Sequence, residues 1–147
     1  MKLKLLSLAV LLFLSLWSTC YGQASQDKLY GNWTFDYESS LKRMDDEAKS
    51  NFKTMNENHQ NKIRASYKGR QLILNSDNSF SQISGDGSQF SGSWDYDDQK
   101  YRLILTYSDG MIYPLVIIQN TGARLTLKPQ VLDSGKPLFQ EWHFIKN

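Results

Sequence analysis

The sequence predicts a mainly β protein: an antiparallel meander barrel of about eight strands, with one long helix inserted between the first and second strands. Short runs that alternate apolar and polar residues are joined by turn residues, and the phrase Gly-x-Trp occurs twice, at 31–33 and 92–94. A glycine two positions before a tryptophan lies on the same strand face, where it leaves room for the indole. Both tryptophans are therefore expected inside the barrel.

The first residues are typical of an export signal. Two lysines precede an apolar segment, 5–16, that is too short to cross a bilayer. We expect residues 1–22 to be a signal peptide that is cleaved after Gly22. Lipidation of Cys20 is the alternative, and it would tether the protein to a membrane. The expected location is accordingly periplasmic or secreted, or else lipid-anchored in the cell envelope.

Charge and cysteine content restrict the functions to consider. Removal of residues 1–22 takes away two lysines and leaves 15 basic against 15 acidic residues, so nothing suggests a nucleic-acid partner. Cys20 is the only cysteine, so a chain cleaved after it has neither a disulfide nor a thiolate metal site. The length suits one domain. We expect a polar arm at 23–28 and the barrel domain at 29–147.

The elements can be placed in order from the hydrophobic pattern. The first strand is expected at 29–37, where Gly31, Trp33 and Phe35 share one face. The helix is expected at about 41–68, because apolar residues recur there at steps of three or four. The remaining strands, separated by turn residues, are expected at 70–75, 79–84, 89–96, 100–107, 111–119, 123–129 and 138–146.

These motifs carry a family resemblance that covers 29–146. The matching segments are Leu29 to Trp33, Leu72 to Phe80, Ser91 to Trp94, and Trp142 to Phe144. With them, the chain resembles the small lipocalin-like domains of exported bacterial proteins, common in Bacteroidetes-type bacteria. In lipocalins an arginine from a late strand packs across the first tryptophan, which would place Arg124 over Trp33. Lipocalins carry their helix after the strands, so the resemblance implies the fold more than the ligand.

Aromatic residues are the candidates for a ligand cavity inside the barrel. The expected lining residues are Trp33, Phe35, Phe80, Phe90, Trp94, Tyr113 and Trp142. The expected structural residues are Gly31, Trp33, Gly92, Trp94 and Arg124. The function they suggest is non-catalytic binding of a small apolar or amphipathic ligand. The alternative is an envelope accessory module whose barrel is filled by side chains and whose outer surface contacts a protein partner.

The sequence has no pattern typical of catalysis. His59 and His143 are the only histidines and lie far apart in the chain, so no metal site is expected. The acidic run 95–98 reads as a solvated hairpin turn, and the G-x-S-x-G and P-loop patterns are absent. We expect no enzyme activity, no catalytic residue and no cofactor. Membrane contact is expected only if Cys20 is lipidated.

Overall fold

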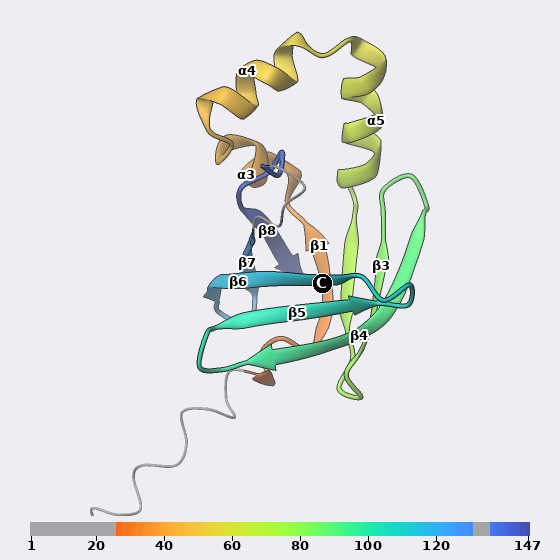
Figure 1. The fold of residues 1–147 in the computed structure, drawn as a ribbon, viewed down its shortest axis with the longest axis vertical. Coiled ribbons are helices and arrows are strands. Elements are labelled where there is room, and N and C mark those ends of the chain that lie inside the picture. Colours follow the sequence, from red (N-terminus) through yellow and green to blue (C-terminus); the bar gives the residue numbers. More distant parts are fainter. Residues whose placement is uncertain (1–25, 131–135) are drawn as a thin grey trace, which may run out of the picture.

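The computed structural model, which describes residues 26–130 and 136–147, is a closed barrel of eight antiparallel strands (Figure 1). The strands follow one another around the barrel in chain order, and β1 pairs with β8 to close it. The predicted mainly β class and eight-stranded barrel are confirmed. The strands are β1 (Gly31–Phe35), β2 (Gln71–Leu74), β3 (Ser79–Ile83), β4 (Gln89–Asp97), β5 (Arg102–Tyr107), β6 (Ile112–Asn120), β7 (Arg124–Pro129) and β8 (Trp142–Lys146). The expected signal peptide at 1–22, with Cys20, lies outside the described residues.

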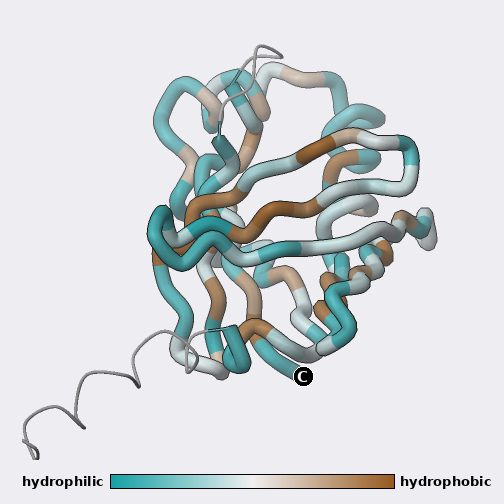
Figure 2. Tube along the Cα trace, turned by 60° about the horizontal axis from the view of Figure 1, so that its bottom comes forward, coloured by the Kyte–Doolittle hydropathy of each residue, from teal (hydrophilic) through white to brown (hydrophobic). Residues whose placement is uncertain are grey.

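The core of the barrel is built by the alternation that the sequence shows. Every second residue of β2 and β3 is buried, as are Leu103 and Leu105 of β5, and hydrophobic segments alternate with polar ones along the strands in Figure 2. Leucines from β5, β6 and β7 fill the centre, and aromatic rings from the other strands pack around them. The fully buried leucines there are Leu103, Leu105, Leu115, Leu125 and Leu127.

Three short helices connect β1 to β2, and the expected single helix at 41–68 is wrong. They are α3 (Tyr37–Lys42), α4 (Asp46–Thr54) and α5 (Glu57–Tyr67). Two internal N-caps cause the breaks: Asp45 accepts a hydrogen bond from the Ala48 backbone N–H at 2.8 Å, and Asn56 accepts one from His59 at 2.9 Å. The apolar stripe is buried only in part: α4 buries Ala48 and Phe52, whereas α5 has no fully buried residue.

Two strands are shorter than expected, for local reasons. β1 ends at Phe35 because Asp36 caps α3, accepting a hydrogen bond from the Ser39 backbone N–H at 3.1 Å. β8 begins at Trp142, and the residues before it form an irregular segment. In that segment Phe139 is buried and packs edge-on against Phe35 at a centroid distance of 5.7 Å.

The helices lie over one end of the barrel, which we call the helical end (Figure 1). β1 finishes and β2 starts at this end, since the three helices join them. The opposite end, which we call the closed end, contains the start of β1 and the turn between β2 and β3. Within the described residues, no helix combines the length and the apolar character needed to span a membrane.

Candidate functional site

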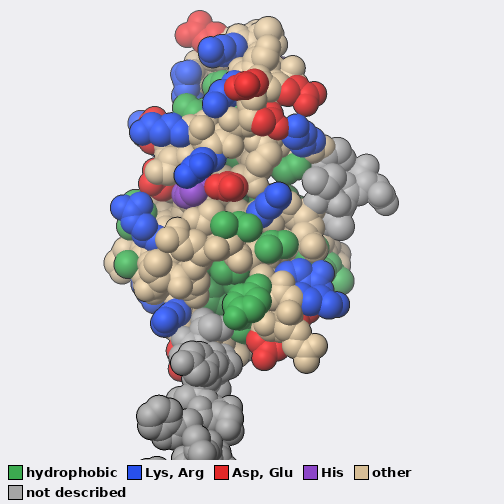
Figure 3. Space-filling model, turned by 90° about the vertical axis from the view of Figure 1, so that its left-hand side faces the viewer, with side chains coloured by type: hydrophobic (Ala, Val, Ile, Leu, Met, Phe, Trp, Pro, Cys, Tyr) green, Lys and Arg blue, Asp and Glu red, His purple; other side chains and the backbone are tan. Residues whose placement is uncertain are grey.

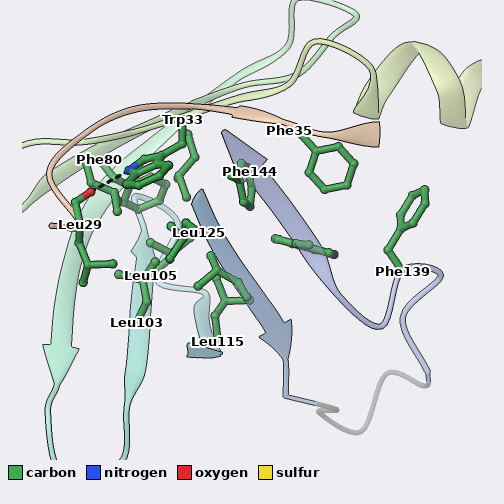
Figure 4. Packing of buried hydrophobic residues seen from close by; sticks show 14 of the residues in the cluster. Leu29, Trp33, Phe35, Phe80, Leu103, Leu105, Leu115, Leu125, Phe139 and Phe144 are labelled. Carbon is green, nitrogen blue, oxygen red and sulfur yellow. Dashed lines mark hydrogen bonds between the residues drawn. The ribbon is translucent and has the colours of Figure 1, made fainter. Parts of the chain in front are cut away.

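The two Gly-x-Trp tryptophans seal the closed end of the barrel. Trp33 and Trp94 are 0% and 2% exposed. The Trp33 indole N–H donates to the Leu29 carbonyl oxygen at 2.8 Å, and that of Trp94 donates to Asn75 at 3.0 Å (Figure 4). Both acceptors are backbone carbonyls of loops at the closed end. Each indole N–H, the only polar group of the side chain, is hydrogen-bonded to a nearby backbone carbonyl. These bonds hold both tryptophans in place, and the two side chains plug this end of the barrel.

The paired glycines leave room for neighbours other than the indoles. A Cβ atom on Gly31 would lie 2.5 Å from Lys146 Cε, and one on Gly92 would collide with the carbonyl oxygen of Thr106 and lie 2.9 Å from Phe80 Cε1. Gly31 therefore accommodates a lysine side chain, whereas Gly92 allows close approach of the β5 backbone.

Arg124 does not cover Trp33, contrary to the expectation carried over from lipocalins. Arg124 is exposed at the start of β7. The cation beside Trp33 is Lys146 of β8, whose Nζ lies 5.0 Å from the indole centroid. A cationic side chain thus sits over the first tryptophan, but it comes from the last strand.

Most of the aromatic residues expected to line a cavity are buried, and their rings contact aromatic residues outside the expected set. Phe35, Phe80 and Trp142 are buried, and Phe35 contacts Phe144 edge-on at 5.4 Å. Figure 4 shows Phe35, Phe80 and Phe144 together with the central leucines inside the barrel. None of the principal clefts bounded by described residues is lined by Trp33, Phe35, Phe80 or Trp94.

Phe90 and Tyr113 lie away from this packed centre, toward the helical end. Phe90 is 48% exposed, so it stands at the rim rather than inside, and its ring contacts Tyr107 edge-on at 6.3 Å. Tyr113 is partly buried and stacks on Trp142, with ring centroids 5.7 Å apart. The seven expected residues are therefore not brought together around one cavity.

A large apolar cleft lies among the helices, outside the barrel. This helix groove has a volume of about 650 Å³. Its apolar residues are Leu41, Met44 and Phe52. Its remaining lining residues are Lys42, Lys49, Lys53, Gln60 and Arg64. The groove thus joins an apolar floor to four cationic side chains, and no carboxylate is among its described lining residues.

A second cleft opens at the helical end of the barrel, beneath the C-terminus of α5. This Arg70 cleft has a volume of about 310 Å³. It is lined by Ser66, Arg70, Gln82, Ser84, Asp86, Ser88, Phe90, Tyr107 and Met111. Arg70 is only 9% exposed, and its guanidinium carbon lies 3.9 Å from the Tyr67 ring centroid. The Tyr107 hydroxyl donates to Gln82 Oε1 at 3.3 Å.

The two histidines lie on separate elements, His143 on β8 and His59 on α5. His143 Nε2 lies 3.1 Å from a Glu141 oxygen and His143 Nδ1 lies 3.3 Å from the hydroxyl of Thr126, which is almost fully buried. His59 is exposed on α5. In the segments that the structure describes, no three histidine, cysteine, aspartate or glutamate side chains cluster as metal ligands would.

The cationic residues of the two clefts were not singled out from the sequence. The lysines of α3 and α4 read as part of a solvated outer face, and Arg70 read as the start of a strand. Comparison with protein-family models, curated proteins and solved structures finds no match to this chain. The site therefore has to be interpreted from its own geometry.

Proposed function

We propose that this chain is an exported, lipocalin-like binding protein without enzymatic activity, and that it binds a small amphipathic anion in the helix groove. The sequence suggests a small apolar or amphipathic ligand, and the cations of the groove narrow this to an amphipathic anion. Its place is moved from the barrel interior to the helices, because aromatic rings and leucines occupy the interior. A volume of about 650 Å³ is within the usual range for a small-molecule site.

The observation that carries the proposal is the pairing of an apolar floor with unpaired cations. Met44 and Phe52 are nearly buried at the base of the groove. Within the described residues, none of the four cationic lining residues forms an ion pair with a carboxylate. An acyl chain would bury its methylenes on the floor, at roughly 0.8 kcal/mol for each one. Its anionic head would meet the cations at the rim.

Three carboxylates of the helical region are engaged by other groups. Asp45 and Glu47 both pair with Lys136. Asp36 accepts hydrogen bonds from the backbone N–H and the hydroxyl of Ser39. Figure 3 shows charged side chains of both signs over the helices, and Lys136 forms ion pairs with two of the negative ones, Asp45 and Glu47.

Helix dipoles explain only part of this positive charge. Lys42, Lys53 and Arg64 each lie in the last turn of their helix, where a cation is stabilised by the dipole. Lys49 lies in the first half of α4, where the dipole gives no such benefit. A ligand-binding role accounts for Lys49 and for the convergence of all four cations on one apolar groove.

Calorimetric titration of the exported protein with dodecanoate tests the proposal. Dodecanoate should bind with simple saturation, and dodecyltrimethylammonium should bind at least about tenfold more weakly because its charge is of the wrong sign. The double variant Lys49→Glu/Lys53→Glu should lose most of the dodecanoate affinity. Lys62→Glu is the matched control, since Lys62 is exposed on α5 and does not line the groove. Equal binding of the two detergent-like probes would contradict the proposal.

The alternative function, a protein-interaction module of the envelope, is favoured by one observation. Met111, Ile112 and Ile118 are each more than half exposed at the start and along the length of β6. Figure 3 shows hydrophobic side chains gathered on the barrel below the helices. If dodecanoate fails to bind, and Ile112→Lys or Ile118→Lys prevents co-purification of an envelope partner, this alternative replaces the ligand-binding proposal.

Export is the part of the proposal that depends on the N-terminus. Cleavage after Gly22 would release a soluble chain that starts at Gln23, whereas lipidation would anchor it through Cys20. The intact mass of protein purified from the envelope separates these two outcomes. A mass that still includes residues 1–22 would contradict export by either route.

A further inference from the structure

We infer that Arg70 and Trp142 form a second binding site at the helical end of the barrel, and that its ligand is a small carboxylate. This site is separate from the helix groove, and the inference does not depend on the proposed function. It rests on two buried hydrogen-bond donors that lack acceptors and on a cleft that Arg70 lines.

Arg70 is a buried cation without a counter-ion in the described part of the chain. Its Nε–H is buried and has no hydrogen-bond partner, and no described carboxylate forms an ion pair with it. Arg102 also leaves its Nε unpaired, but its Nη2 pairs with Asp97 at 3.2 Å. Burial of an uncompensated guanidinium is costly unless something of opposite charge can reach it. The cation–π contact with Tyr67 offsets only a small part of that cost.

The nearby tyrosines do not neutralise Arg70. Burial raises the pKa of Tyr107 and of Tyr113, and the opposing pull of the Arg70 charge is too weak to reverse either shift. Both hydroxyls therefore keep their protons at neutral pH. The Tyr107 hydroxyl uses its proton to bind Gln82. The positive charge at this end of the barrel thus remains available to an anion.

Trp142 supplies the second orphan donor. Its side chain is almost fully buried, and its indole N–H has no partner, whereas the indoles of Trp33 and Trp94 both bind backbone carbonyls. The Trp142 ring centroid lies 5.8 Å from the Arg70 guanidinium carbon. Two buried donors in such proximity and without acceptors are uncommon in a folded protein. A carboxylate carries two acceptor oxygens, and the planar guanidinium of arginine matches its geometry.

The Arg70 cleft gives the ligand a route and limits its size. The cleft of about 310 Å³ suits a compact molecule, with Phe90 and Met111 available to contact its apolar part. One carboxylate, that of Asp86, lies on the lining. It accepts hydrogen bonds from the Ser66 hydroxyl at 3.1 Å and from the Ser88 backbone N–H at 3.0 Å. These bonds occupy Asp86, so it leaves Arg70 free for the ligand.

Nuclear magnetic resonance of the tryptophan indole N–H groups tests the inference in the intact exported protein. Benzoate is the probe, and benzamide is its uncharged counterpart of the same shape. Benzoate should shift the Trp142 indole resonance saturably and should leave those of Trp33 and Trp94 in place, since their hydrogen bonds are already made. No saturable shift, an equal response to benzamide, or tighter binding of inorganic phosphate than of benzoate would overturn the inference.

Variants separate a binding role from a purely structural one. Arg70→Gln should abolish the benzoate response, and Trp142→Phe should weaken binding about tenfold through loss of one donor to a charged acceptor. Arg124→Gln is the matched control, because Arg124 is exposed and far along the chain from the cleft. Benzoate should also raise the Tm of the wild type. If Arg70→Gln does not fold, Trp142→Phe carries the test, and unchanged benzoate affinity in that variant would overturn the inference.

Discussion

The side chain of Lys146 lies across the indole of Trp33, with Nζ 5.0 Å from the ring centroid. This contact joins the last strand to the first at the closed end of the barrel, where β1 and β8 pair. Gly31 makes it possible, because a Cβ atom there would lie 2.5 Å from Lys146 Cε. The first Gly-x-Trp motif therefore secures barrel closure as well as filling the core.

The two motif glycines should differ in their tolerance of alanine. Gly92→Ala should lower the free energy of unfolding by about 3 kcal/mol or more, because its Cβ would collide with the backbone oxygen of Thr106. Gly31→Ala should cost less, about 1–2 kcal/mol, since its φ of +130° is strained but the flexible Lys146 side chain can move away. Urea denaturation of both variants measures the difference.

A control isolates the backbone part of the Gly31 effect. Gly110 has a φ of +88° and open space around its Cα, so Gly110→Ala tests conformational strain alone. Lys146→Ala should cost about 0.5–1 kcal/mol in the wild type. It should cost almost nothing after Gly31→Ala, where the contact is already displaced. Additive costs for Gly31→Ala and Lys146→Ala would show that the glycine does not accommodate the lysine.

Trp33 should contribute to stability as a fully buried core residue. Trp33→Ala should lower the free energy of unfolding by about 3–5 kcal/mol, because it opens a large cavity and removes the hydrogen bond to Leu29. Met111→Ala is the comparison, since Met111 is 51% exposed and should change stability by less than about 0.5 kcal/mol. An unchanged Tm in Trp33→Ala would refute the plug role of this residue.

Acid should weaken the start of the helical region through Asp36. Burial acts to raise the pKa of this carboxyl, but hydrogen bonds from Ser39 and the charges of His143 and Arg124 hold it below its usual value. The folded state therefore binds the proton less readily than the unfolded state does. The stability that this carboxylate contributes is complete above the unfolded pKa, about 3.9, and is lost as the pH falls through the lower folded pKa.

The Asp36→Asn variant tests this pH dependence. Asparagine keeps an N-cap acceptor for α3 but cannot titrate. The dependence of the urea midpoint on pH, measured between pH 6 and pH 2, should be flatter in the variant than in the wild type. Parallel curves would mean that Asp36 contributes no part of the acid sensitivity.

The strand pattern was readable from the sequence because barrel strands have a strict two-residue alternation and turn residues mark their ends. The helical region was harder, because Asn56 could equally be a polar position on the outer face of one helix. Only the backbone reveals it as an N-cap. Which cation would meet Trp33 depended on the pairing of β1 with β8, which no local pattern specifies.

The two clefts were inaccessible to sequence reasoning for a similar physical reason. The helix groove forms where three separately capped helices turn toward one another, so its cations come from different periodic segments. Arg70 reads as the polar start of a strand, and its burial arises from α5, β3 and β5 meeting around it. Phe90 lies on the same face of β4 as the buried Trp94, so the alternation predicts that it points into the barrel. It is nevertheless 48% exposed, because it lies near the end of the strand, at the rim of the barrel.

The central claim is that the helix groove, and not the barrel interior, binds an amphipathic anion. An amide nitrogen–proton correlation spectrum, recorded while dodecanoate is titrated into the protein, tests it most directly. We expect saturable changes concentrated at residues 41–64, with the Trp33 and Trp94 indole resonances unmoved. Changes centred on those two indoles, or no saturable change between 41 and 64, would contradict the claim.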